Sequence, residues 1–587
     1  MNLKKILHSR FYPLILVFSY LFLMGVDIFV LDHFSKGKIT EVLKIWIPWG
    51  LKVNFFLILT AVLFCCQDIA GWIRNFFNRK GLLLAALLSL SFSMCFFAAP
   101  RTHRIYYDED IYANVAQNMA LSNQTGYCNY GTFEYGEYFP HWISYNKEPS
   151  GWPFLISLPF QIFGINELFA FVLNNLLFTL GVLTIFLIPW HLTGNYFISF
   201  SAALAYAFIP HNLLWSNTAA AETSAGVLAG VTVLALVVYL KTRQNRHLYL
   251  LVLLLPLACQ MRPESCMLLP WAMAAGLVVS PQILKDRKVW SLGLLTTLFL
   301  LPHVLHFYAV SGHSWGAQGN KFSTEFLYHN LEVNGLYYLT DKTFPLIITI
   351  FAALGLFFFR GMLRWRLLML FWFLPFWGIF LFFYAGSYQY GADVRFALLS
   401  FMPLAILAGM GAGWIQKNLL VVRYRTMGID SIQNSSAARN MTACLVLLLM
   451  LFSLLKFLPL TRLLGQEAWG SRYDHKYAQE FIAMIPERSI VLTQNPTMFL
   501  LWNQNAIQTH AGINNPGLIK ELMKKYQGHV YFHDNYWCNT QNRRNVRLCQ
   551  DIRDKYDLEA VATASEQHYQ YGLYRMKLKG GTAKKSK

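Results

Sequence analysis

Apolar runs of about 20 residues recur along this chain, and they constrain its fold more than any other feature. A helical run of that length matches the thickness of the hydrocarbon core of a bilayer. We predict about thirteen such runs to be membrane-spanning helices. They cover residues 11–31, 48–66, 81–100, 168–190, 197–210, 223–240, 247–260, 266–279, 289–310, 344–359, 367–385, 397–416 and 441–460. The pattern therefore predicts a polytopic α-helical membrane protein.

The composition agrees with this prediction. Only 13% of the residues are charged, and the mean hydropathy is +0.36, whereas a soluble domain carries about 25% charged residues. The net charge of +19 could suggest nucleic-acid binding. However, the basic residues gather in alternate short loops, as they do on the cytoplasmic side of membrane proteins. We therefore expect contact with the lipid bilayer and no nucleic-acid partner.

The loop charges also predict an orientation. Basic residues cluster near residues 4–10, 74–80, 241–246, 285–288, 360–366 and 417–425. All these clusters share one side if the N-terminus is cytoplasmic, and the exceptions are Lys36, Lys38 and Lys44 in the first outer loop. The first apolar run lacks a convincing cleavage site, so we interpret it as a signal anchor. We expect an integral protein of a bacterial inner membrane, with its C-terminal part outside the cytoplasm.

The sequence divides into four parts. Residues 1–80 are predicted to form two additional N-terminal helices, and residues 81–460 a transmembrane catalytic domain with a large first outer loop at 101–164. Between 461 and 578, strand-like and helix-like segments alternate, which predicts a small α/β domain with a partly parallel sheet. The tail, residues 579–587, is rich in Gly, Lys and Ser and is predicted to be disordered.

The outer loop is a polar island between apolar runs, and it begins with R-T-H-R-I-Y-Y-D-E-D-I-Y. Three carboxylates follow one another there, at Asp108, Glu109 and Asp110. Charged groups so close to a bilayer are costly to place, which favours a functional role. The alternative is that they cap a helix beginning near Ile111.

Basic groups are predicted at the same level of the membrane. Lys147 lies in K-E-P-S-G-W-P, Arg262 lies between two short apolar runs in Q-M-R-P-E-S, and Arg395 heads a span. Together they could hold a phosphate head group. As alternatives, Lys147 could snorkel towards the interface, and Arg262 could pair locally with Glu264. Glu222 adds an acidic group at this face.

With these motifs, the sequence resembles the GT-C glycosyltransferases that use polyprenyl-phosphate-linked sugars, such as the lipid A aminoarabinose transferases and the protein O-mannosyltransferases. The resemblance covers roughly residues 81–416 and rests on Y-D-E-D-I-Y, K-E-P-S-G-W-P-F-L-I-S-L-P-F-Q-I-F-G, A-A-E-T-S-A-G, R-P-E and V-R-F-A-L-L-S-F-M-P-L-A-I-L-A-G. Two motifs depart from the family. Its Lys-Pro-Pro is Lys-Glu-Pro here, and its Arg-Tyr is Arg395-Phe396.

The resemblance implies that a hexosyl or pentosyl group moves from a polyprenyl phosphate to a hydroxyl of a lipid, glycan or protein on the outer face, with inversion. Phosphate is a good leaving group, so the reaction needs a base for the acceptor rather than a general acid. We expect Asp108 to be this base, with Glu109 as the second catalytic candidate. The cations of Lys147 and Arg262 would hold the departing phosphate. Further substrate contacts are expected from Arg395, Glu222, Asp110 and Tyr107.

No cofactor is required by this chemistry. A divalent metal stays an open alternative, because Glu148 and His141 offer suitable ligands, although their spacing fits no standard site. Two other functions also stay open: a transporter or flippase for a lipid-linked glycan, and a ligase that uses a polyprenyl diphosphate donor. A transporter should show related halves with interrupted spans, and we find no such repeat in the sequence.

Cys538 and Cys549 are the only cysteines of the predicted C-terminal domain. Because that domain is predicted to lie outside the cytoplasm, where disulfides persist, we expect the two to be bonded. The alternative is a pair of buried free thiols.

Overall fold

The computed structural model describes residues 11–76, 79–105, 107–341, 343–389, 393–427, 436–463, 469–540, 543–566 and 569–579. Residues 1–10 and most of the predicted disordered tail, 580–587, lie outside the described residues. The chain divides into two units. The membrane unit comprises Met1–Arg101, Lys147–Trp152 and Phe171–Leu464, and the sheet unit comprises Thr102–Asn146, Pro153–Ala170 and Gly465–Lys587.

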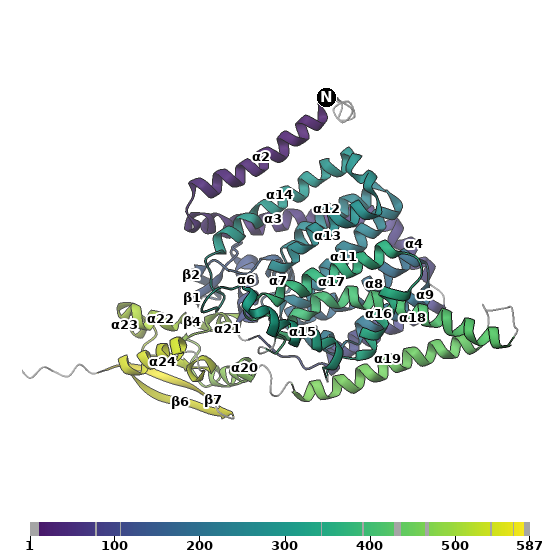
Figure 1. The fold of residues 1–587 in the computed structure, drawn as a ribbon. Coiled ribbons are helices and arrows are strands. Elements are labelled where there is room, and N and C mark those ends of the chain that lie inside the picture. Colours follow the sequence, from purple (N-terminus) through teal and green to yellow (C-terminus); the bar gives the residue numbers. More distant parts are fainter. Residues whose placement is uncertain are drawn as a thin grey trace, which may run out of the picture. The chain divides into compact units, whose positions relative to one another are not determined.

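Every run that we predicted to span the membrane is helical (Figure 1). Among the described residues, eight helices are long and apolar enough to cross a bilayer, and the other five predicted spans form shorter apolar helices. The helices of the membrane unit are α2 (Tyr12–His33), α3 (Lys36–Phe64), α4 (Cys66–Phe76), α5 (Arg79–Ser93), η1 (Met94–Ala98), α8 (Leu168–Thr193), α9 (Tyr196–Ala207), α10 (Pro210–Trp215), α11 (Ala221–Thr242), α12 (Asn245–Cys259), η2 (Pro263–Met267), α13 (Leu268–Val279), η3 (Pro281–Lys285), α14 (Arg287–Val310), η4 (Thr324–Phe326), α15 (Leu327–Thr340), α16 (Leu346–Phe358), α17 (Leu363–Gly378), η5 (Ile379–Leu381), η6 (Asp393–Ala397), α18 (Leu398–Met427) and α19 (Ser436–Leu463).

Polar residues between the apolar runs start several of these helices. The Ser35 hydroxyl accepts from the backbone N–H of Lys38 at the start of α3, and the Asn195 amide oxygen accepts from two N–H groups at the start of α9. Asp286 does the same for α14. Each side chain satisfies a backbone donor that the helix cannot pair itself. The predicted breaks between spans therefore have a local cause in the sequence.

Small residues let the central helices approach closely. Helix α18 packs against α9, α11, α16 and α17. A Cβ atom on Gly411 of α18 would lie 1.9 Å from the Phe351 carbonyl oxygen of α16, and one on Gly355 would lie 1.9 Å from the Leu407 carbonyl oxygen. Only glycine permits these distances, as is typical of helix contacts in membranes, where close packing replaces the hydrophobic effect.

The sheet unit is built on a seven-stranded sheet with the order β2-β1-β4-β3-β5-β7-β6. The strands are β1 (Tyr127–Glu134), β2 (Glu137–Ser144), β3 (Ile490–Thr493), β4 (Asn505–Gln508), β5 (Val530–Asp534), β6 (Tyr556–Glu566) and β7 (Tyr569–Leu578). Its helices are α6 (Asp108–Leu121), most of α7 (Gly151–Phe163), α20 (Trp469–Ile482), α21 (Pro496–Leu501), α22 (Thr509–Asn514), α23 (Pro516–Lys525), η7 (Tyr536–Asn539) and α24 (Arg543–Lys555). Strand β3 runs parallel to both β4 and β5, so the sheet is partly parallel, in agreement with the sequence pattern.

The first outer loop contributes two of these strands. Its hairpin β1–β2 turns at Tyr135 and Gly136, both with positive φ, and β1 pairs antiparallel with β4 at Tyr130↔Ile507 and Gly131↔Ala506. The sequence analysis counted this loop with the transmembrane domain, whereas most of it lies in the sheet unit. Strand pairing across more than 370 residues leaves no local trace in the sequence.

The sheet is covered on both faces. Ile490 and Leu492 of β3 point into one buried apolar cluster, and Val491 points into another. Successive side chains of a strand alternate between faces, so a strand covered on both sides becomes a continuous apolar run. This accounts for the sequence I-V-L-T of β3.

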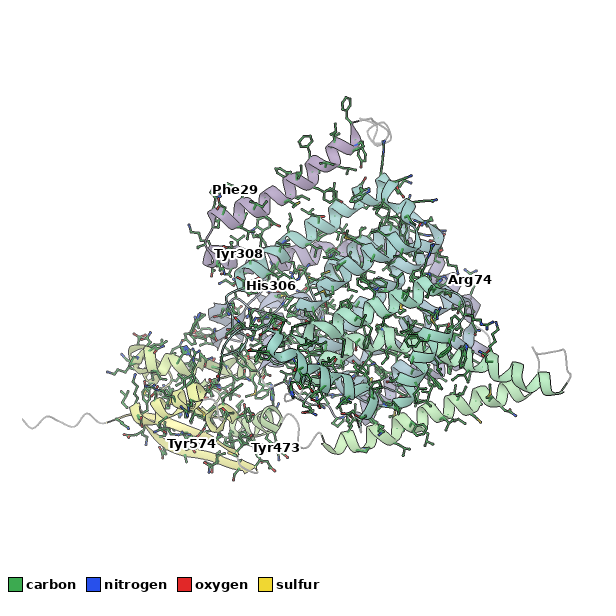
Figure 2. All side chains as sticks on the ribbon, in the orientation of Figure 1. Phe29, Arg74, His306, Tyr308, Tyr473 and Tyr574 are labelled. Carbon is green, nitrogen blue, oxygen red and sulfur yellow. A yellow bond between two sulfur atoms is a disulfide. The ribbon has the colours of Figure 1, made fainter. Side chains whose placement is uncertain are left out.

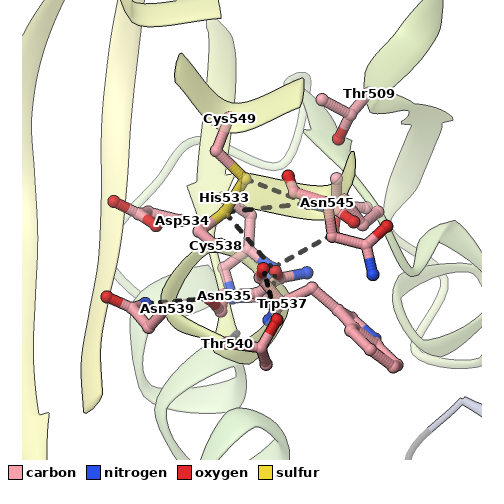
Figure 3. The surroundings of a disulfide bond; sticks show 12 residues. Thr509, His533, Asp534, Asn535, Trp537, Cys538, Asn539, Thr540, Asn545 and Cys549 are labelled. Carbon is pink, nitrogen blue, oxygen red and sulfur yellow. Dashed lines mark hydrogen bonds between the residues drawn. A yellow bond between two sulfur atoms is a disulfide. The ribbon is translucent and has the colours of Figure 1, made fainter. Parts of the chain in front are cut away.

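Cys538 and Cys549 form a disulfide, with Cα atoms 5.6 Å apart (Figure 3). It joins η7 to α24. The Gln494 amide donates to the Cys549 sulfur at 2.9 Å and to the Asn545 carbonyl oxygen at 3.2 Å. Both sulfur-bearing residues lie in the apolar cluster below β3 and β5.

Replacing Cys538 and Cys549 together by serine should lower the unfolding free energy by about 2–3 kcal/mol, because the unfolded chain regains the entropy of a short loop. Denaturant unfolding of the detergent-purified protein measures this change. Cys444→Ser, at an exposed free cysteine, is the control and should change little. Alkylation of both Cys538 and Cys549 in unreduced, denatured protein would contradict the bridge.

Candidate functional site

The motif K-E-P-S-G-W is anchored to two loops of the membrane unit. The Gly151 N–H donates to the Gln260 carbonyl oxygen at 2.8 Å, and the Trp152 indole N–H donates to the Ala219 carbonyl oxygen at 2.8 Å. A Cβ atom on Gly151 would lie 2.5 Å from that Gln260 oxygen, so the contact requires glycine. The segment that carries Lys147 is thereby held beside the turn before Arg262.

Two adjacent asparagines of α8 position the loop that precedes Glu222. The Asn174 amide donates to the carbonyl oxygens of Thr218 and Ala220, both at 2.8 Å, and the Asn175 amide donates to that of Ser216 at 2.7 Å. Sequence reasoning did not identify this pair. The signal was present, because two neighbouring amides inside an apolar run require partners.

Glu222 lies in the first turn of α11, and three further charged groups gather around it. Arg262 donates to Glu222 at 2.6 Å and to Glu264 at 2.5 Å, and the Arg395 Nε atom lies 3.5 Å from the same Glu222 oxygen. Glu222 is fully buried and Arg262 nearly so. The pairing of Arg262 with Glu264, expected as an alternative, is present together with the contact to Glu222. Two positive and two negative charges compensate one another in this cluster.

Phe396 lies against both guanidinium groups of the cluster. The Arg395 and Arg262 guanidinium carbons lie 4.9 and 5.7 Å from the centre of its ring. The ring also stacks on Phe380 at 4.2 Å. The departure from Arg-Tyr to Arg395-Phe396 therefore keeps an aromatic face for the two cations.

Lysines gather beyond the end of α14. Lys36 donates to the Ser311 hydroxyl at 2.7 Å, and Lys321 donates to the carbonyl oxygen of His313 at 2.8 Å. Partial burial, followed by the charges of Lys147, Lys321 and Lys36, lowers the pKa of His313. His306 and Tyr308 lie in the last turns of α14 (Figure 2). His306, seven residues before His313, hydrogen-bonds the backbone of Lys147, and Lys36 lies over the ring of Tyr308. Lys147 thus belongs to a group of cations, which we call the lysine group (Lys36, Lys147 and Lys321).

In the sheet unit, the acidic run forms the first turn of helix α6, which begins at Asp108 rather than near Ile111 as the capping alternative expected. Tyr107 precedes the helix with a φ of +77°, a conformation that costs a residue with a side chain about 1–3 kcal/mol. Asp108 is the first helical residue and is half-buried, whereas Glu109 and Asp110 are fully buried. Strained residues concentrate at functional sites, which agrees with a special role for this turn.

The three carboxylates differ in their partners. One Glu109 oxygen accepts from the backbone N–H groups of Arg104 and Ile105 at 2.7 and 2.9 Å, so this side chain fixes the backbone before the helix. Asp110 accepts from His475 at 2.8 Å and from Asn495 at 2.7 Å. Asp108 differs from both in burial, because it is half-buried whereas Glu109 and Asp110 are fully buried.

Asp110 lies in a buried charged cluster that includes His103, Glu109, Glu167 and His475. Although burial opposes the effect, His475 lowers the pKa of Asp110, and Asp110 in turn raises the pKa of His475. Burial alone would lower the pKa of His103, but Glu109 and Glu167 hold it well above its ordinary value. The carboxylates thus favour added positive charge between them. Sequence reasoning missed His475, which lies 365 residues from Asp110.

The two predicted metal ligands do not share a described site. His141 lies on β2 in the sheet unit, where it hydrogen-bonds the Thr132 hydroxyl at 2.8 Å, and burial lowers its pKa. Glu148 belongs to the membrane unit. A metal bound by this pair stays a prediction.

Comparisons with known proteins bear on the whole chain. Residues 147–306 match the family described as dolichyl-phosphate-mannose-protein mannosyltransferase. Crystal structures of ArnT from Cupriavidus metallidurans, bound to undecaprenyl phosphate and in the apo state, share the fold with a TM-score of 0.51 and 14% identity, over 86% of this chain and 98% of that chain. These matches confirm the predicted resemblance as a likeness in fold to the GT-C membrane enzymes.

Two further comparisons add little to this result. The archaeal oligosaccharyltransferase AglB from Archaeoglobus fulgidus aligns at 12% identity with a TM-score of 0.49, over 86% of this chain and 75% of that chain. No curated protein matches the sequence. Lys147, Glu222 and Arg262 lie within residues 147–306, so the anchored segment and the core of the charge cluster fall in the part of the chain that matches the family.

Replacing Arg262 by methionine should lower the unfolding free energy by about 3–5 kcal/mol, because it leaves buried carboxylates with less compensation. Adding Glu264→Gln should recover part of the loss. Thermal unfolding in detergent measures both variants, and Arg364→Met, at an exposed arginine, is the matched control. Equal stability of the Arg262 and Arg364 variants would mean that the cluster does not stabilise the fold.

Proposed function

We propose that this chain transfers a single sugar from a polyprenyl-phosphate donor to a hydroxyl group of a lipid, glycan or protein on the outer face of the membrane. The anchoring of the Lys147 segment beside the Arg262 turn carries this proposal, because it gathers cations in the region that matches the mannosyltransferase family. The ArnT structure bound to undecaprenyl phosphate supports a donor of the same lipid class.

Lys147 and Arg262 have different parts in the proposed site. Arg262 already donates to two carboxylates, so a phosphate would share its guanidinium with Glu222 and Glu264. Lys147 carries a compact charge on a flexible stem, and its half-buried side chain lies among other lysines. We therefore assign the main phosphate contact to Lys147, with Arg262 and Arg395 completing the positive surroundings. The second Glu222 oxygen has no hydrogen-bond partner within the described ranges and would accept from a sugar hydroxyl.

Asp108 is the proposed base. The acceptor oxygen attacks the anomeric carbon, its proton passes to the Asp108 carboxylate, and the bond from that carbon to the phosphate oxygen breaks. The polyprenyl phosphate leaves as an anion that the cations stabilise, so neither a general acid nor a cofactor is required. A single displacement inverts the anomeric centre. Tyr107 and the buried Glu109 and Asp110 would hold Asp108 in place.

Asp108→Asn should reduce transfer by about 100-fold or more, because the amide cannot accept the proton. Purified protein is incubated with a panel of polyprenyl-phosphate sugars and acceptor extracts, and the glycosylated product is identified by mass spectrometry. The exposed Glu137→Gln of β2 is the control and should retain activity. No product from the wild type with any donor, together with movement of the intact lipid-linked glycan across vesicles, would instead support a transporter.

Lys147→Ala should weaken binding of the donor by about 10-fold, because a charged contact to phosphate contributes roughly 1.5–3 kcal/mol. Lys147→Arg should restore only part of the affinity, since its planar head group differs in shape and reach. Binding of a fluorescent polyprenyl phosphate measures both variants, with the exposed Lys285→Ala as the matched control. Unchanged affinity in Lys147→Ala would place the phosphate elsewhere.

A further inference from the structure

The sheet unit contains a group of side chains of the kinds that bind metal ions. His103 and Asp110 come from the first outer loop, and His475 comes from α20. One ligand atom from each of the three lies within 4.8 Å of the others. The three residues are 6%, 0% and 8% exposed, so the group is shielded from solvent.

Further side chains orient each member of this group. Asn495 donates to one Asp110 oxygen at 2.7 Å, while the other oxygen faces His475 at 2.8 Å. The two nitrogens of His103 lie 3.3 Å from Glu109 and 3.5 Å from Glu167. Whichever nitrogen of His103 acts as a ligand, the other therefore faces a carboxylate. Such carboxylate–histidine contacts are the usual outer partners of a metal-bound imidazole.

The negative charges of the carboxylates in this cluster can be compensated by a divalent ion. The buried carboxylates of Glu109 and Asp110 and the half-buried carboxylate of Glu167 surround two imidazole rings that stack at 4.1 Å with an angle of 13°. Two protonated rings in that arrangement would repel each other. A divalent ion supplies the same two positive charges and leaves both rings neutral.

We propose that His103, Asp110 and His475 bind one divalent transition-metal ion of the zinc class. Two imidazoles and one carboxylate are a common ligand set for zinc, and the fourth position would be taken by Glu109, Glu167 or water. Ligand atoms of a tetrahedral zinc site lie about 3.3 Å apart. The 2.8 Å between His475 and Asp110 therefore needs to open by about half an ångström, and the widest pair, which lies within 4.8 Å, needs to close by up to about 1.5 Å.

The ion would fasten two distant parts of the chain. His103 and Asp110 flank the start of α6, and His475 lies in the C-terminal segment, 365 residues after Asp110. The metal would thus hold the turn that carries Asp108 against the C-terminal part of the sheet unit. This is a structural role, separate from the transfer chemistry, and its test needs no donor or acceptor.

The test is the metal content of the full-length protein, purified in detergent with a tag that lacks histidine. Mass spectrometry of the elements should find about one zinc per chain, bound as purified or after incubation with zinc and desalting. His103→Gln and His475→Gln should each lower the content to background, whereas His529→Gln, outside the cluster, should retain it. No stoichiometric zinc in the wild type under either condition would overturn the proposal.

A readout on the unaltered chain covers the case in which the histidine variants do not fold. Treatment of the wild type with a strong zinc chelator should lower its melting temperature, and added zinc should restore it. Substitution with cobalt should give the visible absorption of a tetrahedral site with nitrogen and oxygen ligands. A melting temperature that does not respond to chelator or zinc would count against the site.

Discussion

The compensation of buried charge by opposite charge is the constraint on which the candidate site of the membrane unit depends. Leaving an isolated ion in an apolar interior costs several kcal/mol, so a guanidinium there needs carboxylates. Arg262 has Glu222 and Glu264, and Arg395 adds a second cation beside Glu222. The neutral cluster can thus persist without substrate. A phosphate entering near it would meet cations already fixed in place, at little cost in side-chain order.

The same constraint acts differently in the sheet unit. There the carboxylates outnumber the cations around His103 and His475, and the imbalance favours bound protons or a bound cation. Glu109 also satisfies two backbone N–H groups, so its charge stabilises the chain before α6 rather than reaching a substrate. The three consecutive acidic residues differ in their burial. Glu109 and Asp110 are buried in the turn, whereas Asp108 is half-buried and is the residue that we propose as the base.

The sequence predicted the features that are local. Run length located every helix of the predicted spans, because a bilayer requires about 20 apolar residues in a row. The motif K-E-P-S-G-W identified a segment whose glycine and tryptophan do anchor it. What it could not predict was contact between distant segments. The pairing of β1 with β4 and of Asp110 with His475 spans most of the chain, and β4 has only the short sequence N-A-I-Q. The asparagine pair of α8 was visible, but its loop partners were not.

The structure suggests why some lysines depart from the positive-inside rule. Lysines on the predicted outer side oppose the usual orientation signal of a membrane protein. Lys36 is one of these exceptions, and it contacts Ser311, as does Lys321. Burial lowers the pKa of the neighbouring His313, and the charges of Lys147, Lys321 and Lys36 all lower it further. Cations this close repel one another unless an anion lies between them. A group that opposes both the predicted topology and self-repulsion agrees with the proposed site, since the phosphate of a lipid-linked sugar would supply a compensating negative charge.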